Sequence, residues 1–121
     1  MMAGKDEIKH WVDGYVNAWK SNNAQDIAKL FIEDAYYSTG PFDEPWIGQQ
    51  AIIDGWVAIG DQPQDWTFDY EVVAADGDLG VMTGTTVYKG NVGTFSNVWL
   101  IRLAPDGRCK EFREWFVKKR E

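Results

Sequence analysis

The stretch DGRCKEFREWF, residues 106–116, begins with a turn pair and continues with alternating side chains. Asp-Gly before such a pattern is a strong signal for a hairpin turn. Because successive side chains of a strand point to opposite faces, Phe112, Glu114 and Phe116 share one face, whereas Arg113 and Trp115 lie on the other. The stretch therefore predicts a strand that places a carboxylate between two phenyl rings.

Three further strands are predicted upstream of this one. The alternation begins at Trp66, from which aromatic or aliphatic side chains occupy every second position as far as Val72. Turn signals at residues 76–78, 89–91 and 105–107 then separate the segments 79–88, 93–103 and 108–118. Strands joined by short turns predict an antiparallel meander.

The first half of the chain has helical periodicity instead. Between residues 6 and 20, apolar side chains recur at intervals of three and four. Residues 21–23, Ser-Asn-Asn, end this helix and cap a second one, which we expect to run from residue 24 to near residue 34. A short strand at 35–39, a turn, a brief extended piece and a third helix at 49–59 follow. Helices before a meander predict an α+β fold, and the length predicts one domain over residues 1–121.

Composition argues against several kinds of function. Lys and Arg number 12 against 19 Asp and Glu, and the net charge of −7 would repel nucleic acid. The single cysteine, Cys109, permits no intrachain disulfide, which favours a cytoplasmic protein. One Cys and one His cannot make a zinc site, and no glycine-rich turn has the spacing of a phosphate cradle, so we expect neither metal nor cofactor. No apolar run approaches the roughly 18 residues that cross a membrane, so we expect no membrane partner.

The order of elements, with DAYYSTGPFDEPWIGQQAI (residues 34–52) and DGRCKEFREWF, resembles the nuclear transport factor 2-like superfamily, and within it SnoaL-like domains and ketosteroid isomerases. The resemblance implies a cone, in which three helices pack in the concave face of a strongly curved sheet and an apolar interior holds a ligand. The isomerase's oxyanion-donating tyrosine matches Tyr15. Its aspartate base falls near Thr39 and its second donor matches Trp99, so steroid isomerisation by that mechanism is not implied.

The resemblance also sets which strand face points inward. The inward positions are mostly apolar, and the polar exceptions are Asn97 and Glu114. A carboxyl in apolar surroundings has a raised pKa and can exchange protons near neutral pH. We therefore expect Glu114 to act as general acid and base, with Tyr15 and Asn97 as polarising donors. Two alternatives stay open: Glu114 is a bonded structural residue near the rim, or the strand slips by one residue and turns Arg113 inward.

The expected ligand is a small apolar molecule, most simply one with rings, which the protein isomerises, cyclises or hydrates without a cofactor. The alternative is a non-catalytic binding or dimerisation module whose rings fill the cone. The side chains that we expect to contact the ligand are Trp19, Phe31, Tyr37, Trp56, Phe68, Tyr70, Met82, Trp99, Phe112 and Phe116.

Two surface features complete the predictions. The outward face of the sheet mixes aliphatic side chains such as Val98 and Leu100 with polar ones such as Thr83, a composition that suggests a homodimer through this face. Asp43 and Glu44 lie in the Gly- and Pro-rich hairpin, which edges the cavity mouth in the fold that the chain resembles. A gating role there is the alternative to simple solvation.

Overall fold

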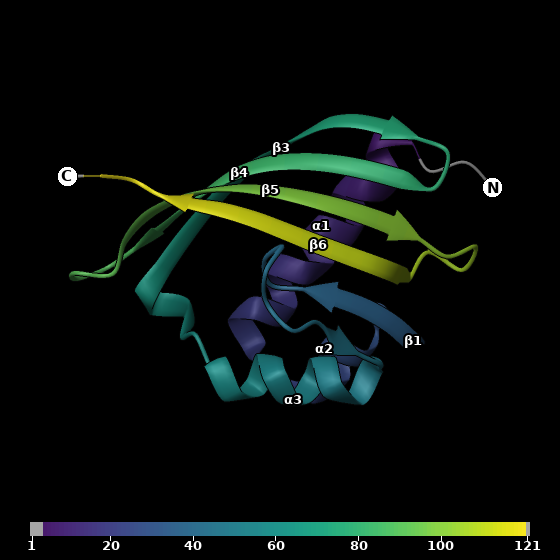
Figure 1. Cartoon of the computed structure of the whole chain (residues 1–121), viewed down its shortest axis with the longest axis horizontal. Helices are drawn as coiled ribbons and strands as arrows, with labels where there is room; N and C mark the ends of the chain where they lie inside the picture. The colour runs from purple at the N-terminus through teal and green to yellow at the C-terminus, as the bar shows by residue number, and fades with distance from the viewer. Residues whose placement is uncertain (1–3, 121) are drawn as a thin grey trace.

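The computed structural model describes residues 4–120, and its central feature is a curved six-stranded sheet (Figure 1). The strands lie in the order β2-β1-β6-β5-β4-β3. They comprise Phe31–Ser38 (β1), Trp46–Ile47 (β2), Trp66–Asp76 (β3), Leu79–Tyr88 (β4), Gly93–Leu103 (β5) and Cys109–Lys118 (β6). Neighbouring strands are antiparallel except β1 and β6, which are parallel. The predicted meander is β3 to β6, and the predicted α+β class is confirmed.

The helices lie on the concave side of this sheet. They comprise Lys5–Ser21 (α1), Ala24–Ala28 (α2), Gln49–Ile59 (α3) and the short 3-10 helix Pro63–Asp65 (η1). Strands β3 to β6 arch over α1, and α3 lies across the open side of the arch (Figure 1). Asn22, in the left-handed conformation, closes α1, and the Asn23 side chain accepts two backbone N–H bonds at the start of α2. No helix within residues 4–120 has the length and hydropathy to span a bilayer.

The second helix is shorter than its sequence predicts. It ends at Ala28, and residues 31–34 belong to β1, so the helix expected to reach residue 34 was wrong there. The Cys109 backbone N–H donates to the Leu30 carbonyl oxygen at 2.7 Å, and β1 then pairs in parallel with β6. Because that partner strand is distant in the sequence, local periodicity carries no sign of the pairing.

The core lies between α1 and the concave face of the sheet. The helix buries Ile8, Trp11, Val12, Tyr15 and Ala18. The Ile8 side chain contacts β4 at Gly80, where a Cβ atom would lie 2.5 Å from two Ile8 side-chain atoms. Glycine therefore permits this helix–sheet contact. The tightly packed contact occupies the part of the arch near the start of α1, and a cavity remains towards the end of the helix.

Candidate functional site

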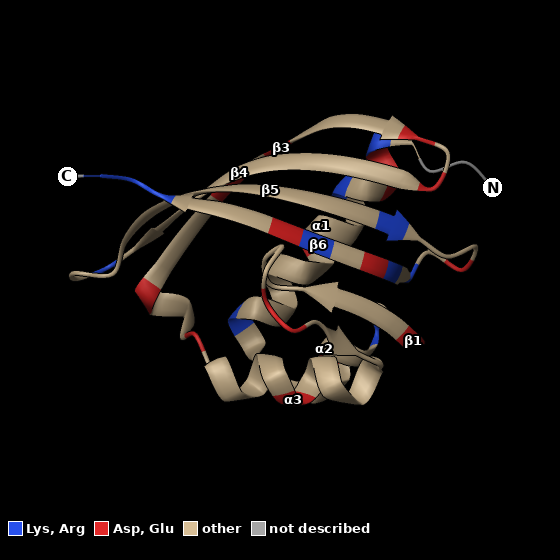
Figure 2. Ribbon diagram, in the orientation of Figure 1, with Lys and Arg blue, Asp and Glu red and all other residues tan. Residues whose placement is uncertain are grey.

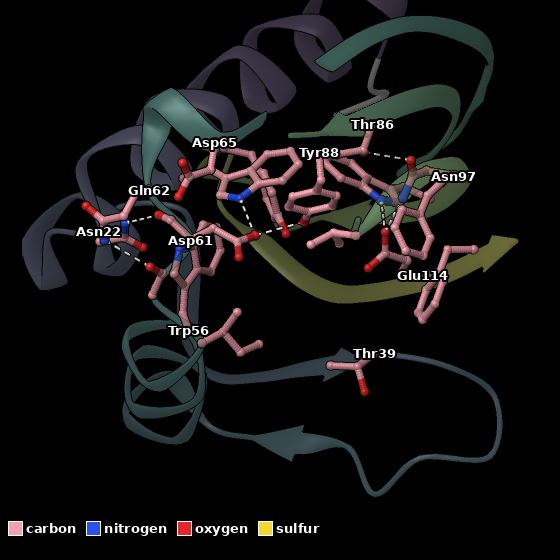
Figure 3. Close-up of a pocket in the computed structure, with 18 of the residues that line it drawn as sticks. Asn22, Thr39, Trp56, Asp61, Gln62, Asp65, Thr86, Tyr88, Asn97 and Glu114 are labelled. Carbon is pink, nitrogen blue, oxygen red and sulfur yellow. Dashed lines mark hydrogen bonds between the residues drawn. The ribbon is translucent and has the colours of Figure 1, made fainter. Parts of the chain in front are cut away.

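A cavity of about 670 Å³ lies under the arch, between the sheet, the end of α1 and the end of α3 (Figure 3). Its volume is that of a typical small-molecule site, which is roughly 300–1,000 Å³. The α1–α2 turn, the β1–β2 hairpin, the α3–β3 connection and strands β4 to β6 all contribute to the wall. The lining residues are Tyr15, Trp19, Asn22, Tyr37, Thr39, Asp43, Trp46, Trp56, Ile59, Gly60, Asp61, Gln62, Asp65, Thr86, Tyr88, Lys89, Val92, Phe95, Asn97, Trp99, Glu114 and Phe116.

Glu114 on β6 lies on the wall of this cavity, on the face that the strand phase predicts. Its Oε2 atom accepts hydrogen bonds from Asn97 Nδ2 at 2.8 Å and from Trp99 Nε1 at 2.9 Å. Asn97 Oδ1 in turn accepts from Thr86 Oγ1 at 2.8 Å, so a chain of side chains crosses from β4 to β6 (Figure 3). Three adjacent strands thus hold the carboxyl group in one orientation.

Burial raises the pKa of Glu114, and the bonds from Trp99 and Asn97 oppose this without cancelling it. Both bonds come from neutral donors and reach the same oxygen. A carboxyl with a raised pKa, held at a cavity wall, can accept a proton from a ligand and return it.

A second polar group at the cavity is a pair of tyrosines. The Tyr15 and Tyr37 hydroxyl oxygens lie 2.7 Å apart, and both side chains are buried. Burial raises the pKa of both hydroxyls, and the nearby Glu114 raises them further. Two hydroxyls carry two hydrogens and their mutual bond uses one, so the other hydrogen is available to a ligand.

The two side chains expected to polarise a ligand both make hydrogen bonds within the protein. The Tyr15 hydroxyl shares one hydrogen bond with the Tyr37 hydroxyl. Asn97 is engaged on both sides, because its Nδ2 donates to Glu114 and its Oδ1 accepts from Thr86. Asn97 is thus placed to orient the carboxyl group, and the polarising roles of Tyr15 and Asn97 on a ligand stay predictions.

A second carboxylate, Asp61, lies at the cavity, and no sequence pattern singles it out. It follows Gly60, whose left-handed conformation ends α3 and turns the chain back towards the sheet. Its Oδ2 atom accepts from Trp19 Nε1 at 3.0 Å and from the Tyr88 hydroxyl at 2.8 Å (Figure 3). Burial and this bond to Asp61 raise the pKa of Tyr88. In the sequence, Asp61 is indistinguishable from an ordinary turn residue. Only its contacts with Trp19 and Tyr88 in the folded chain indicate that it belongs to the cavity wall.

The expected ligand-contacting side chains divide into two groups. Five of them line the cavity: Trp19, Tyr37, Trp56, Trp99 and Phe116. The other five are not among the lining residues, which corrects the expectation for Phe31, Phe68, Tyr70, Met82 and Phe112.

The five side chains that do not line the cavity take part in the packing between α1 and the sheet. Phe31, Met82 and Phe112 are fully buried in the core. Phe68 stacks on Trp99 with ring centroids 5.2 Å apart, and the Tyr70 hydroxyl bonds to Asp13 of α1. Phe68, Tyr70, Met82 and Phe112 lie on the inward strand face, but α1 occupies the space that they face.

The β1–β2 hairpin forms one edge of the cavity. Both acids are exposed; Asp43 lines the cavity and accepts a bond from Thr39 Oγ1 at 2.9 Å, whereas Glu44 is not among the lining residues. Trp46 also lines it and stacks on Tyr37 at 4.8 Å between ring centroids. The hairpin contributes an acid and a ring to the wall, and a gating role stays a prediction. Within residues 4–120, no group of three or more His, Cys, Asp or Glu side chains is arranged to hold a metal ion.

Comparison with protein-family models matches residues 12–112 to the SnoaL-like domain. The chain belongs to the SnoaL-like domain family. The match runs from within α1 to the start of β6, so it includes Tyr15, Tyr37, Asp61 and the two donors to Glu114, whereas Glu114 itself lies just beyond it. The expected membership is confirmed. A comparison with curated proteins found no match.

Solved structures with the same fold are numerous and distant in sequence. A candidate ketosteroid isomerase from Kribbella flavida aligns with a TM-score of 0.73 at 15% identity, over 97% of this chain and 82% of that one. A candidate SnoaL-like polyketide cyclase from Shewanella denitrificans gives 0.70 at 18%, over 90% and 89%. A LEH-like epoxide hydrolase of M. tuberculosis gives 0.67 at 16%, over 93% and 84%. At these identities the likeness establishes the fold and not the reaction.

Proposed function

We propose that this SnoaL-like chain binds a small ring-containing molecule in the cavity and carries out cofactor-free acid–base chemistry on it. The observation that carries the proposal is Glu114, a carboxyl group of raised pKa held by Asn97 and Trp99 at the wall of a ligand-sized cavity. The aromatic rings around it supply the apolar contacts that a ring compound needs.

The proposed chemistry is proton transfer next to a carbonyl group. Ionised Glu114 removes a proton from the carbon beside the carbonyl. The C–H electron pair forms a carbon–carbon double bond, and the π electron pair of the C=O bond moves onto the oxygen to give an enolate. The free hydrogen of the Tyr15–Tyr37 pair bonds to that oxygen and stabilises its charge. Protonated Glu114 then returns the proton to carbon, at the same or a conjugated position, so atoms and charge balance. Isomerisation and aldol-type cyclisation both use such an enolate.

The alternative is a binding module in which Glu114 only ties β5 to β6. The observation that favours it is that its Oε2 atom already accepts two hydrogen bonds within the sheet. A module whose aromatic rings fill the cone would have no such space, so the cavity of about 670 Å³ argues against a filled core.

The test is a ligand screen followed by a matched pair of variants. Ring ketones of one to four rings are screened by thermal shift, and those that bind are incubated in D₂O and followed by NMR for exchange of hydrogens beside the carbonyl. We expect Glu114→Gln to keep binding and to slow exchange roughly 100-fold or more, the scale of a lost general base. Glu111→Gln, the same change on β6 outside the cavity, should behave as wild type. Unchanged exchange in Glu114→Gln would leave the binding module as the function.

A further inference from the structure

Charged side chains are unevenly distributed along the chain. Residues 30–88 contain no Lys, Arg or His, although Asp and Glu recur throughout that range. The charged residues of the β1–β2 hairpin and of the α3–β3 connection are therefore all acidic (Figure 2). Both segments contribute to the cavity wall.

The cavity shares this imbalance. Four carboxyl side chains line it, those of Asp43, Asp61, Asp65 and Glu114, against the single cation Lys89. Among the described residues, none of the four takes part in an ion pair. A concave site with charges of one sign and low-dielectric walls concentrates its field and attracts ligands of the opposite charge.

Two acceptors without donors lie at the Asp61 corner. Asp61 Oδ2 accepts from Trp19 and Tyr88, whereas no hydrogen bond reaches Oδ1 from residues 4–120. Asn22 Nδ2 donates to the Asp61 carbonyl oxygen, which assigns the orientation of the amide, and leaves Asn22 Oδ1 buried without a partner in the described chain. A buried acceptor without a donor is costly, so this corner favours a ligand that brings N–H or O–H groups.

The walls of the same corner are aromatic. Trp19 stacks on Trp66 with ring centroids 3.7 Å apart, and its Nε1 bond to Asp61 fixes the ring in place. Tyr88 is held by Asp61 and contacts Phe95 edge-on at 5.7 Å. The face of an aromatic ring carries partial negative charge and attracts ammonium groups.

We propose that the ligand of this cavity is a ring compound carrying a protonated amine, with its ammonium group at Asp61 and Asn22 and its ring system directed towards Glu114. The inference rests on the proposed function only in requiring that the cavity binds a small molecule. An ammonium group supplies positive charge and several N–H donors, which match a carboxylate, an amide oxygen and ring faces together. A neutral hydroxyl supplies one donor and no charge, and a carboxylate is repelled.

Ligands with one ring system and different head groups test the inference directly. The probes are tryptamine, tryptophol and indole-3-acetate, and the corresponding amine, alcohol and acid of naphthalene and of a tricyclic ring, measured by calorimetry and thermal shift at fixed ionic strength. We expect the amine of a ring system to bind roughly tenfold or more tightly than its alcohol, and the acid to bind weakest. Asp61→Asn, which keeps an oxygen for Trp19 and Tyr88, should abolish the preference for the amine over the alcohol.

Asp69→Asn is the matched control, since it removes one negative charge from an exposed site outside the cavity. If Asp61→Asn and Asp69→Asn weaken amine binding equally, the preference for the amine over the alcohol comes from the net charge of the protein, and the inference is overturned. Alcohols that bind wild type as tightly as amines would also overturn it and leave the proposed function standing. If no probe of any ring size or head group binds, the inference falls, and the ring-ketone screen decides the proposed function. Should Asp61→Asn fail to fold, the head-group series on wild type decides.

Discussion

At the scale of single residues, the structure explains why Glu114 can remain on an apolar face. Its partners Asn97 and Trp99 belong to the neighbouring strand β5, and Trp99 lies directly opposite it in the register. The two bonds offset part of the cost of removing a carboxyl group from water, yet the pKa of Glu114 remains raised. The residue therefore destabilises the fold when it is ionised.

This cost predicts a pH-dependent gain in stability for Glu114→Gln. The folded pKa of Glu114 is raised above its ordinary value of 4.5, so its neutral form favours folding at low pH and this contribution is lost as pH rises through the folded pKa. Glutamine cannot ionise and escapes the loss. The melting temperature of Glu114→Gln relative to wild type should rise by a few degrees between about pH 4 and pH 8.

The measurement is the melting temperature of wild type, Glu114→Gln and Glu111→Gln across the same pH range. Glu111 pairs with Arg113 outside the cavity and controls for the loss of one charge from β6. A melting-temperature difference that stays constant with pH would contradict the raised pKa.

At the scale of elements, the cavity exists because α1 packs tightly against one end of the sheet and leaves the other open. The close approach at Gly80 brings the helix against β4. Helix α1 ends at Ser21, and the chain turns at Asn22 into α2. The parts of β4, β5 and β6 that extend past the end of α1 therefore face the cavity and are not covered by the helix. The position of α1 thereby decides which inward side chains become core and which become cavity wall.

Gly80→Ala tests this contact. The added Cβ would clash with Ile8 Cδ1 and Cγ1, both at 2.5 Å, so we expect a destabilisation of about 1–3 kcal/mol. Ile8→Ala removes the clashing atoms, and the double variant should lose less stability than the sum of the single variants, as measured by urea denaturation. Strict additivity would mean that the contact does not control how α1 docks.

At the scale of the whole molecule, the outer face of the sheet exposes several apolar side chains that no part of the described chain covers. Trp115, Val98 and Thr83 lie in one row across β6, β5 and β4, and Leu100 extends the apolar surface beside them. Trp115 is 39% exposed and Val117 is 70% exposed, although the central strands of a sheet seldom leave such side chains in water. We propose that a second copy of the chain covers this face. The cytoplasmic location, which was expected from the single Cys109, also stays a prediction.

A charge placed on this face should dissociate the proposed dimer. We expect wild type to elute as a dimer in size-exclusion chromatography with light scattering, and Trp115→Glu to raise the dimer dissociation constant at least roughly tenfold. Phe42→Ser, which removes a 99% exposed ring from the β1–β2 hairpin, is the control and should remain dimeric. A monomeric wild type would refute this assembly and leave the cavity and its chemistry untouched.

The sequence by itself determined the α+β class and the strands from Trp66 onward, because period and turn chemistry are local properties that survive in any context. The alternation placed Glu114 with Phe112 and Phe116, and the family resemblance supplied the inward direction of that face. Only the tertiary structure decided that residues 31–34 are strand, since their partner β6 lies far along the chain. It alone brought Asp61 to the cavity and gave Phe112 to the core while Phe116, two residues later, lines the wall. Those outcomes depend on where α1 ends beneath a curved sheet, and residue spacing holds no information about the space that a packed helix leaves open.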